Sequence, residues 1–367
     1  MNYVKTLAVT LTFALLLATG LGACLWYGAH PVTYSRVEKR PLATFPQSIT
    51  WQSLVDKTSI DQFEDFTVDQ FPARQFFRAI KARFVMRVLG QKQNNGYAME
   101  DGSIAQIKAT FDEKNLDHSL SRLSDICARY PIDKERLYLA IVPDKNYFFA
   151  KDYGYPGPDY EALVNTACER LPDATYLDLF PHLTLSDYYK TDWHWDQAHL
   201  LGVLDVLGEG MGFADALPDR YDTHTLTPYY GGYYEQSALY PPSETLTYLS
   251  NEIIDACRVY DYATGKTTGV YVPANFESDT GYDFFLSGMT GLLRIDNPLA
   301  ASEGELVVLR DSFGSSLLPL VAQAYRTVWV VDIRNVLPAS LGSWIDFSGK
   351  DVLFLFSTTV LDSATFK

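Results

Sequence analysis

Near its carboxyl end the chain carries Val307-Val308-Leu309-Arg310-Asp311-Ser312-Phe313-Gly314, an apolar run that stops at Asp-Ser and is followed by glycine. This pattern predicts a buried strand over 305–309, a turn, and a helix over 316–324. Ligands of open parallel sheets bind beyond the carboxyl ends of strands, where backbone N–H groups can stabilise an oxyanion. Ser312 therefore occupies the position of a nucleophile. The alternative is that Asp311 and Ser312 only cap the helix, because both residue types are preferred as caps.

The surrounding sequence alternates between strands and helices. Buried strands are expected over 136–143, 174–180, 327–332 and 351–356, and helices over 116–130, 159–171 and 197–212. Alternation of this kind predicts an α/β fold with a parallel sheet and crossover helices. Residues 213–300 differ, because their short runs are rich in tyrosine and broken by glycine. They predict a β-rich insertion.

The amino terminus is an uncharged apolar stretch from Thr6 to Ala29. About 20 apolar residues span a bilayer as a helix, so residues 1–29 are interpreted as a signal anchor or a signal peptide. Modification at Cys24, as in a lipoprotein, is the third alternative. The length favours an anchor, with the rest of the chain outside the cytoplasm. Positive charge is expected to stay inside, and the basic residues at 36, 39 and 40 argue against this orientation.

Residues 30–105 are expected to form a helical approach segment, with the main domain at 106–367. Aromatic residues from Ser59 to Leu89 recur at helical spacing and predict a pair of helices broken at Pro72. Turn signals at Asn95-Gly96 and Asp101-Gly102 predict short strands.

The composition excludes several classes of protein. The 30 basic and 45 acidic residues give a net charge of −15, which repels nucleic acid. No zinc-binding or redox spacing occurs among the four cysteines, and no cofactor is expected. Outside the apolar stretch, Cys127, Cys168 and Cys257 allow at most one disulfide, or none.

A second segment supplies partners for Ser312. Tyr188-Tyr189-Lys190-Thr191-Asp192-Trp193-His194-Trp195 places an acid two residues before a histidine. An aspartate can fix the tautomer of an imidazole that takes a proton from a serine, which then attacks an acyl carbon. Asp192, His194 and Ser312 are therefore the candidate catalytic triad. The alternatives are a structural hydrogen bond, or a metal site with Asp196 and His199. No His-Glu-x-x-His pattern supports the metal site.

The tyrosine-rich part of the insertion has two interpretations. Tyr229, Tyr230, Tyr233 and Tyr234 flank a Gly-Gly pair, and such rings more often pack in cores and turns. The functional alternative is a stacking surface for sugars, for which Tyr230 and Tyr233 are the candidates.

Several motifs in this order match a known family. They are Glu38-Lys39-Arg40-Pro41-Leu42-Ala43, Asp69-Gln70-Phe71-Pro72-Ala73-Arg74, Asn95-Gly96-Tyr97, Val142-Pro143-Asp144-Lys145, Asp192-Trp193-His194-Trp195, Tyr230-Gly231-Gly232-Tyr233-Tyr234 and Phe285-Leu286-Ser287-Gly288. Over most of residues 36–360 the chain resembles the DHHW family of exported bacterial proteins and, more distantly, the SGNH-type domains of alginate O-acetyltransferases.

The resemblance implies a circularly permuted SGNH-hydrolase-like, flavodoxin-like fold in which Asp192 orients His194, His194 is the base and Ser312 is the nucleophile. It implies an oxyanion hole formed by the Ser312 N–H, with Gly288 as a second donor. Asp311, next to the serine, is a further candidate for binding the oxyanion or the substrate. Two departures stand out. Trp193 replaces the family's first histidine and is expected to face away from the triad, by the alternation of an extended segment. Met289 stands where the family tends to carry an asparagine.

The resemblance further implies acyl chemistry on a cell-envelope polysaccharide. An acetyl group would be received on Ser312 and passed to a sugar hydroxyl, beside a membrane-bound O-acyltransferase that supplies it. A plain esterase differs only in using water as the acceptor. The third hypothesis is a scaffold of weak or absent activity that binds polysaccharide or a partner protein at the membrane.

Overall fold

The computed structural model describes residues 2–35, 40–277 and 281–367, so Glu38 and Lys39 of the motif Glu38-Lys39-Arg40-Pro41-Leu42-Ala43 lie outside the described residues. The chain forms two compact units. The N-terminal unit comprises Met1–Asn94 and Glu235–Tyr240, and the main unit comprises Asn95–Tyr234 and Pro241–Lys367. The main unit thus includes the residues from Asn95 to Ala105, which were expected in the approach segment.

The N-terminal unit is helical, as the aromatic spacing predicted. Helix α1 (Asn2–Ala29) contains the one segment of the described residues, Tyr3–Ala29, that is long and apolar enough to cross a membrane. The break at Pro72 is confirmed, because it separates two helices. The elements are α1, β1 (Tyr34–Ser35), β2 (Arg40–Pro41), α2 (Trp51–Val55), α3 (Thr58–Asp69), α4 (Arg74–Arg83), a π-helical turn (Phe84–Val88) and β3 (Gln93–Asn94).

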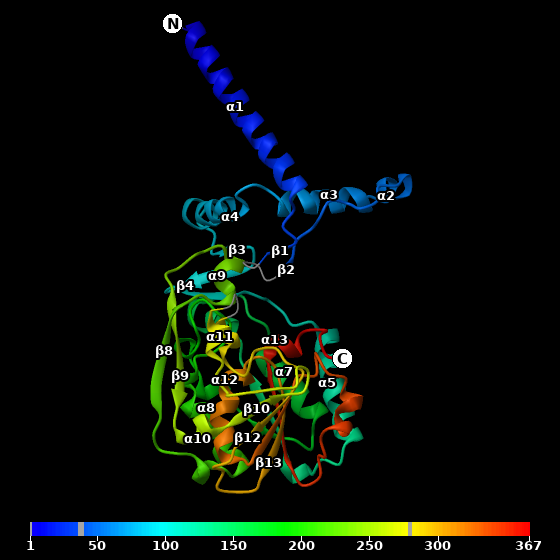
Figure 1. The fold of residues 1–367 in the computed structure, drawn as a ribbon, viewed down its shortest axis with the longest axis vertical. Coiled ribbons are helices and arrows are strands. Elements are labelled where there is room, and N and C mark those ends of the chain that lie inside the picture. The colour runs from blue at the N-terminus through cyan, green and yellow to red at the C-terminus, as the bar shows by residue number, and fades with distance from the viewer. Residues whose placement is uncertain (1, 36–39, 278–280) are drawn as a thin grey trace. The chain divides into compact units, whose positions relative to one another are not determined.

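An eight-stranded sheet forms the centre of the main unit (Figure 1). Its order is β11 (Lys266–Thr268), β10 (Arg258–Asp261), β12 (Leu292–Asp296), β14 (Thr327–Val331), β13 (Glu305–Arg310), β15 (Asp351–Ser357), β6 (Leu137–Val142), β7 (Thr175–Leu177). The pairs from β14 to β7 are parallel, which confirms the predicted parallel sheet.

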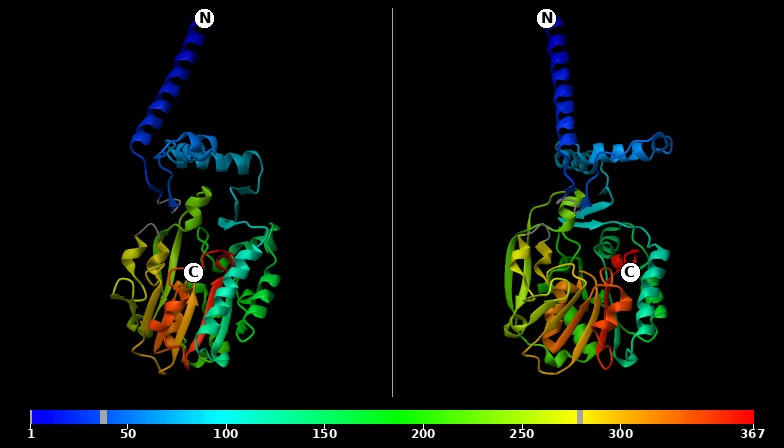
Figure 2. Two further views of the ribbon diagram at one scale, coloured as in Figure 1. Left: turned by 90° about the vertical axis from the view of Figure 1, so that its right-hand side faces the viewer. Right: turned by 45° about the vertical axis from the view of Figure 1, so that its right-hand side comes forward.

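Helices cover both faces of this sheet (Figure 2). On one face, α8 (Leu201–Met211) and α12 (Gly314–Val321) pack against residues such as Val308. On the other, α5 (Glu113–Arg129), α7 (Tyr160–Arg170) and α13 (Thr358–Leu361) pack against residues such as Val307. Successive side chains of a strand point to opposite faces, and both faces are covered. Strand β6 is therefore buried throughout, and β15 is buried from its second residue on.

The predicted β-rich insertion is only partly separate. β8 (Asp222–Tyr229) and β9 (Glu244–Ser250) form their own two-stranded sheet. β10, β11 and β12 instead extend the main sheet as antiparallel strands. Antiparallel addition to an edge depends on backbone pairing between segments far apart in sequence, which local periodicity does not reveal. The insertion also contains α9 (Gly232–Ser237), α10 (Glu252–Ala256) and α11 (Pro273–Phe276).

Two smaller elements matter for the site. The predicted turn at Asp101-Gly102 joins β4 (Tyr97–Glu100) to β5 (Ser103–Gln106). Helix α6 (Lys145–Tyr153) was not predicted; it begins directly after β6, where the Asp144 carboxylate caps it by accepting from Asn146 N at 2.7 Å. Cys127, Cys168 and Cys257 are free thiols, so the alternative without a disulfide is the one observed.

Candidate active site

Ser312 lies in the turn between strand β13 and helix α12, as predicted. Asp311 shapes this turn, since its carboxylate oxygens accept from Phe313 N at 3.0 Å and from Ser357 N at 2.7 Å. Both are backbone amides, and Asp311 is fully buried. The prediction that Asp311 binds substrate or an oxyanion is therefore wrong, because both carboxylate oxygens accept hydrogen bonds from backbone amides and stabilise the turn. The half-buried Ser312 does not cap the helix, whose N-cap is Phe313 without a side-chain cap.

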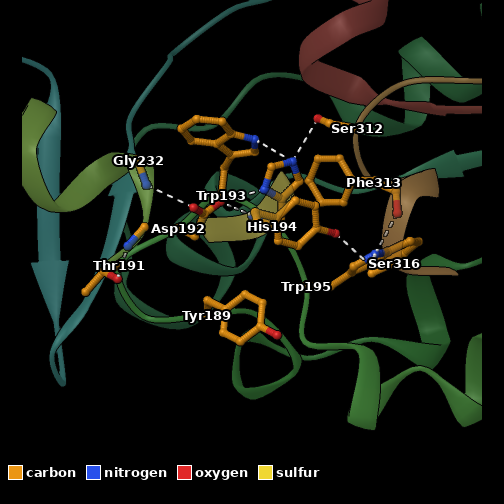
Figure 3. Close-up of polar contacts among 12 residues, drawn as sticks. Tyr189, Thr191, Asp192, Trp193, His194, Trp195, Gly232, Ser312, Phe313 and Ser316 are labelled. Atoms are coloured by element: carbon orange, nitrogen blue, oxygen red, sulfur yellow. Dashed lines mark hydrogen bonds and ion pairs between the residues drawn. The ribbon is translucent and has the colours of Figure 1, made fainter. Parts of the chain in front are cut away.

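Asp192, His194 and Ser312 form a continuous chain of hydrogen bonds (Figure 3). His194 Nδ1 lies 2.7 Å from Asp192 Oδ1, and His194 Nε2 lies 2.8 Å from Ser312 Oγ. A carboxylate can only accept, so Nδ1 carries the proton and Nε2 presents its lone pair to the serine hydroxyl. This is the arrangement in which an imidazole can act as a base toward serine.

Asp192 is buried, and four donors compensate for the loss of water around its charge. Besides His194 Nδ1, Oδ1 accepts from His194 N at 3.0 Å. Oδ2 accepts from the Tyr229 hydroxyl at 2.9 Å and from Gly232 N at 2.9 Å. These hydrogen bonds fix both carboxylate oxygens and so keep the Asp192 side chain oriented toward His194. Sequence reasoning gave no such role to Tyr229 or Gly232.

Aromatic rings hold the imidazole in its plane. The Tyr282 ring stacks on His194 at a centroid distance of 3.7 Å with an interplanar angle of 0°, and Phe313 packs against it at 5.1 Å. Ser316 Oγ takes hydrogen bonds from the Tyr282 hydroxyl at 2.7 Å and from Trp195 Nε1 at 2.9 Å. Trp195 is fully buried and packs against the Phe313 ring. Tyr282 was missed, because nothing in the sequence near it signals contact with His194.

Trp193 does not face away from the triad, so this prediction is wrong. Its indole Nε1 donates to His194 Nε2 at 2.9 Å (Figure 3). The extended alternation fails because the segment folds into a tight turn in which Asp192 Oδ1 accepts from the His194 amide. The lone pair of Nε2 is therefore shared by two donors, the Ser312 hydroxyl and the indole N–H.

The buried Lys145 and the half-buried Glu244 hold the loop that carries Asp192 and His194. Lys145 Nζ donates to the carbonyl oxygens of Tyr189, Lys190 and Asp192 at 2.8, 3.1 and 3.1 Å. Glu244 accepts from Lys190 N at 2.6 Å, from Thr191 N at 2.7 Å and from the Thr191 hydroxyl. The loop backbone is thus held through its carbonyl and its amide groups.

The surroundings of Lys145 and Glu244 shift the pKa of both groups. Burial lowers the pKa of Lys145 to about 7, although Glu244 and Asp192 favour the ammonium form. Burial also raises the pKa of Glu244, against the hydrogen bonds from Thr191 and Lys190. The motif Val142-Pro143-Asp144-Lys145 pointed to this lysine without indicating its function, and no signal pointed to Glu244.

The Gly-Gly pair permits a close approach to the triad. A Cβ on Gly231 would lie 2.3 Å from Asp192 Cβ, and one on Gly232 would lie 2.0 Å from the Trp193 ring. Tyr233 is buried against Trp193, with ring centroids 5.5 Å apart. Tyr230 is 45% exposed, and its ring packs on that of Tyr234 with centroids 4.6 Å apart. The packing interpretation thus holds for Tyr233, and Tyr230 alone of the two presents an open ring to solvent.

Gly288 does not present a free donor. Its N–H donates to Phe285 O at 3.0 Å, and its carbonyl accepts from the buried Arg310 guanidinium at 3.2 Å. The prediction of a second oxyanion donor here is therefore wrong, because that N–H closes a turn. The neighbouring Met289 is 68% exposed. No acceptor in 2–35, 40–277 or 281–367 takes the Ser312 N–H, which leaves this donor available beside the hydroxyl.

The alternative metal site is not assembled. His199 Nδ1 lies 3.2 Å from Ser186 O, whereas Asp196 accepts from Ala198 N at 3.1 Å. Within the described residues, no group of three or more His, Cys, Asp or Glu side chains is placed to hold a metal ion.

Comparisons with known proteins agree with this fold. No protein-family model matches the chain, and no curated protein matches its sequence. A DHHW family protein from Eubacterium siraeum has a similar structure, with a TM-score of 0.59 and 18% identity over 74% of this chain and 93% of that one. PatB1 from Bacillus cereus gives a TM-score of 0.58 and 19% identity over 75% and 99% of the two chains. PatB1 with a sulfonyl adduct gives 0.57 and 19% over 74% and 97%.

These similarities are structural. The main unit has an SGNH-hydrolase-like α/β fold, and the fold expected from the resemblance to DHHW proteins is confirmed.

Proposed function

We propose that this protein is a serine acyltransferase that uses Ser312, His194 and Asp192 to move acetyl groups on a polysaccharide outside the cytoplasm. The observation that carries the proposal is the chain of hydrogen bonds from Asp192 through His194 to the Ser312 hydroxyl, at 2.7 and 2.8 Å. These distances are already within the reach that proton transfer requires.

The first half-reaction forms an acyl-serine. His194 Nε2 takes the proton from Ser312 Oγ, and Oγ attacks the carbonyl carbon of the donor. The proton then passes to the leaving oxygen, and the bond between that oxygen and the acyl carbon breaks. In the second half-reaction His194 Nε2 removes a proton from a sugar hydroxyl, whose oxygen attacks the acyl carbon. The bond between that carbon and Ser312 Oγ breaks, and His194 returns the proton to Oγ. Asp192 holds the Nδ1–H throughout.

Two N–H groups are proposed to stabilise the oxyanion. One is the backbone N–H of Ser312. The other is the indole N–H of Trp193, which shares the Nε2 acceptor with the serine hydroxyl. When Nε2 gains the proton of Ser312, its lone pair is used and the indole loses its acceptor. At the same moment negative charge develops on the acyl oxygen, which can accept this N–H. Trp193 would thereby replace the missing side-chain amide at Met289.

The acyl donor and the acceptor are proposed from chemistry and location. α1 is an anchor or signal candidate. A retained anchor would hold Ser312 near a membrane-bound O-acyltransferase at high effective concentration. This favours direct passage of the acyl group from that enzyme to Ser312 over delivery by a diffusing carrier. Exposed Tyr230 offers a ring on which a sugar can stack. Hydrolysis is the same reaction with water as the acceptor.

The test separates transfer from hydrolysis. The full chain and its Ser312→Ala variant are given an activated acetyl ester, with or without a neutral oligosaccharide. We expect wild type to form acetylated oligosaccharide at the expense of free acetate, and the variant to form neither above background. Acetate release that is unchanged by the oligosaccharide would support an esterase and overturn the proposed transfer.

A binding scaffold is the second candidate. Two observations favour it: the Gly288 N–H already donates to Phe285 O, and Met289 has no side-chain amide. The oxyanion hole would then have few hydrogen-bond donors. Under this candidate, wild type and Ser312→Ala bind oligosaccharide equally and wild type forms no acyl-enzyme.

A further inference from the structure

Helix α4 of the N-terminal unit presents an apolar face to solvent, which the proposed chemistry does not use. At helical spacing, apolar residues of α4 and the following π-helical turn fall on one side. Their exposed fractions are 62% for Phe76, 51% for Phe77, 45% for Ile80, 51% for Phe84 and 67% for Val88. A helix of a soluble domain normally turns this face toward the core.

The opposite side of α4 is the side that the protein covers. Ala82 is 1% exposed. The Arg78 guanidinium donates to the carbonyl oxygens of Glu235 and Gln236 at 3.3 and 2.7 Å, and to Gln75 Oε1 at 2.8 Å. The N-terminal unit thus holds α4 by its polar side. Because these contacts hold the polar side, the apolar side of α4 faces solvent.

Charge indicates what covers the apolar face. Residues 74–92 contain six of the 30 basic residues and no acidic one, within a chain of net charge −15. Lys81, Arg83 and Arg87 are exposed and border the apolar face. An apolar stripe with Phe, flanked by Lys and Arg that can reach outward, is typical of a helix lying in the headgroup layer of an anionic membrane.

The chain also ties the start of α4 to the end of the apolar helix. Gln70, four residues before α4, pairs with the backbone of Val32, three residues after α1. Val32 N donates to Gln70 Oε1 at 3.0 Å, and Gln70 Nε2 donates to Val32 O at 2.9 Å. Asp69 Oδ2 accepts from Ala43 N at 2.9 Å. Whatever bilayer α1 enters, α4 begins close to its surface.

We propose that α4 and its π-helical turn, Arg74–Val88, bind in the headgroup layer of an anionic bilayer. The phenylalanine rings enter the acyl boundary, and Lys81, Arg83 and Arg87 contact lipid phosphates. This contact is independent of the span, so it would keep the protein on the membrane even where α1 is cleaved as a signal peptide. A second copy of the chain is a poorer occupant, because two basic faces repel each other.

The test measures amide hydrogen exchange of the full chain in lipid nanodiscs. One set contains phosphatidylcholine alone, and the other contains equal parts of phosphatidylcholine and phosphatidylglycerol. We expect slower exchange over residues 74–89 in the anionic discs and not in the neutral ones. The protection should be lost in Phe77→Ser/Phe84→Ser, and in Arg83→Gln/Arg87→Gln the binding equilibrium should weaken about 30-fold, since each charge near the surface contributes about fivefold.

The matched control is Lys114→Gln/Arg129→Gln, which removes two exposed basic residues from α5 and should leave the protection intact. Phe77 and Arg83 of α4 and Phe84 and Arg87 of the π-helical turn are all exposed, so their variants should stay folded. Equal exchange in the two kinds of disc would overturn the proposal. Protection that rises with the density of protein in neutral discs would also overturn it, in favour of contact between copies.

Discussion

Gly231→Ala should displace Asp192 while leaving all three residues of the candidate triad unsubstituted. The new Cβ would lie 2.3 Å from Asp192 Cβ and 2.5 Å from both its Cα and its N. Carbon atoms pack at about 3.5–4.0 Å, so the Asp192 backbone has to shift by about 1 Å. The bonds from His194 to Asp192, now 2.7 and 3.0 Å, would then be broken or badly aligned. A misplacement of this size costs about 100-fold in rate.

The assay is the rate at which phenylmethylsulfonyl fluoride modifies Ser312, followed by intact-protein mass. The matched control is Gly202→Ala in α8, where an added Cβ meets nothing within 4 Å. We expect Gly231→Ala to react about 100-fold more slowly and to lose about 1–3 kcal/mol of stability from overpacking, while the control reacts like wild type. If Gly231→Ala stays folded and reacts within twofold of wild type, the argument from positioning is refuted.

Three further changes address single contacts. Trp193→Phe keeps a ring but removes the indole N–H, and should slow acylation of Ser312 by about 100- to 1,000-fold if that N–H stabilises the oxyanion. A faster rate would show that the indole N–H only occupies the lone pair of His194 Nε2. Tyr229→Phe removes a donor to a buried carboxylate and should lower the free energy of unfolding by about 1.5–3 kcal/mol, whereas Tyr230→Phe should leave urea unfolding within about 0.5 kcal/mol of wild type; equal losses would contradict the bond to Asp192. For Lys145 the folded pKa is about 7, below the usual 10.5 of an unfolded chain. The unfolded state then binds more protons between pH 7 and 10, so Lys145 makes the free energy of unfolding rise with pH in this range. Lys145→Met should flatten that rise. If the pH dependence of stability is the same in the variant, Lys145 does not lose its proton in the folded protein.

The hydrogen-bonded group of Asp192, His194 and Ser312 could be predicted because each part has a local signal. The apolar run before Asp311-Ser312 marks a strand end, and Asp-x-His places an acid next to a base. The direction of Trp193 could not be predicted in the same way. It depends on a turn closed by the Asp192 side chain, and an extended segment would have placed the indole on the other side.

The surroundings of the triad come from distant parts of the chain. Tyr229 and Gly232 contact Asp192 across 37 and 40 positions, and Lys145 contacts its carbonyl across 47. Periodicity describes neighbours within one element, so these contacts leave no local pattern. For the same reason the main sheet was predicted from its parallel strands, while the antiparallel strands β10 to β12 were assigned to a separate insertion.

The central claim is that His194 activates Ser312 as a nucleophile. Its most direct test is to mix the full chain with an activated acetyl ester, quench within seconds, and locate the acetyl group by peptide mass spectrometry. The account predicts acetyl on the peptide that contains Ser312 in wild type, strongly reduced labelling in His194→Ala, and none at that position in Ser312→Ala. Wild type without acetyl on Ser312, or with labelling that His194→Ala leaves unchanged, would contradict it.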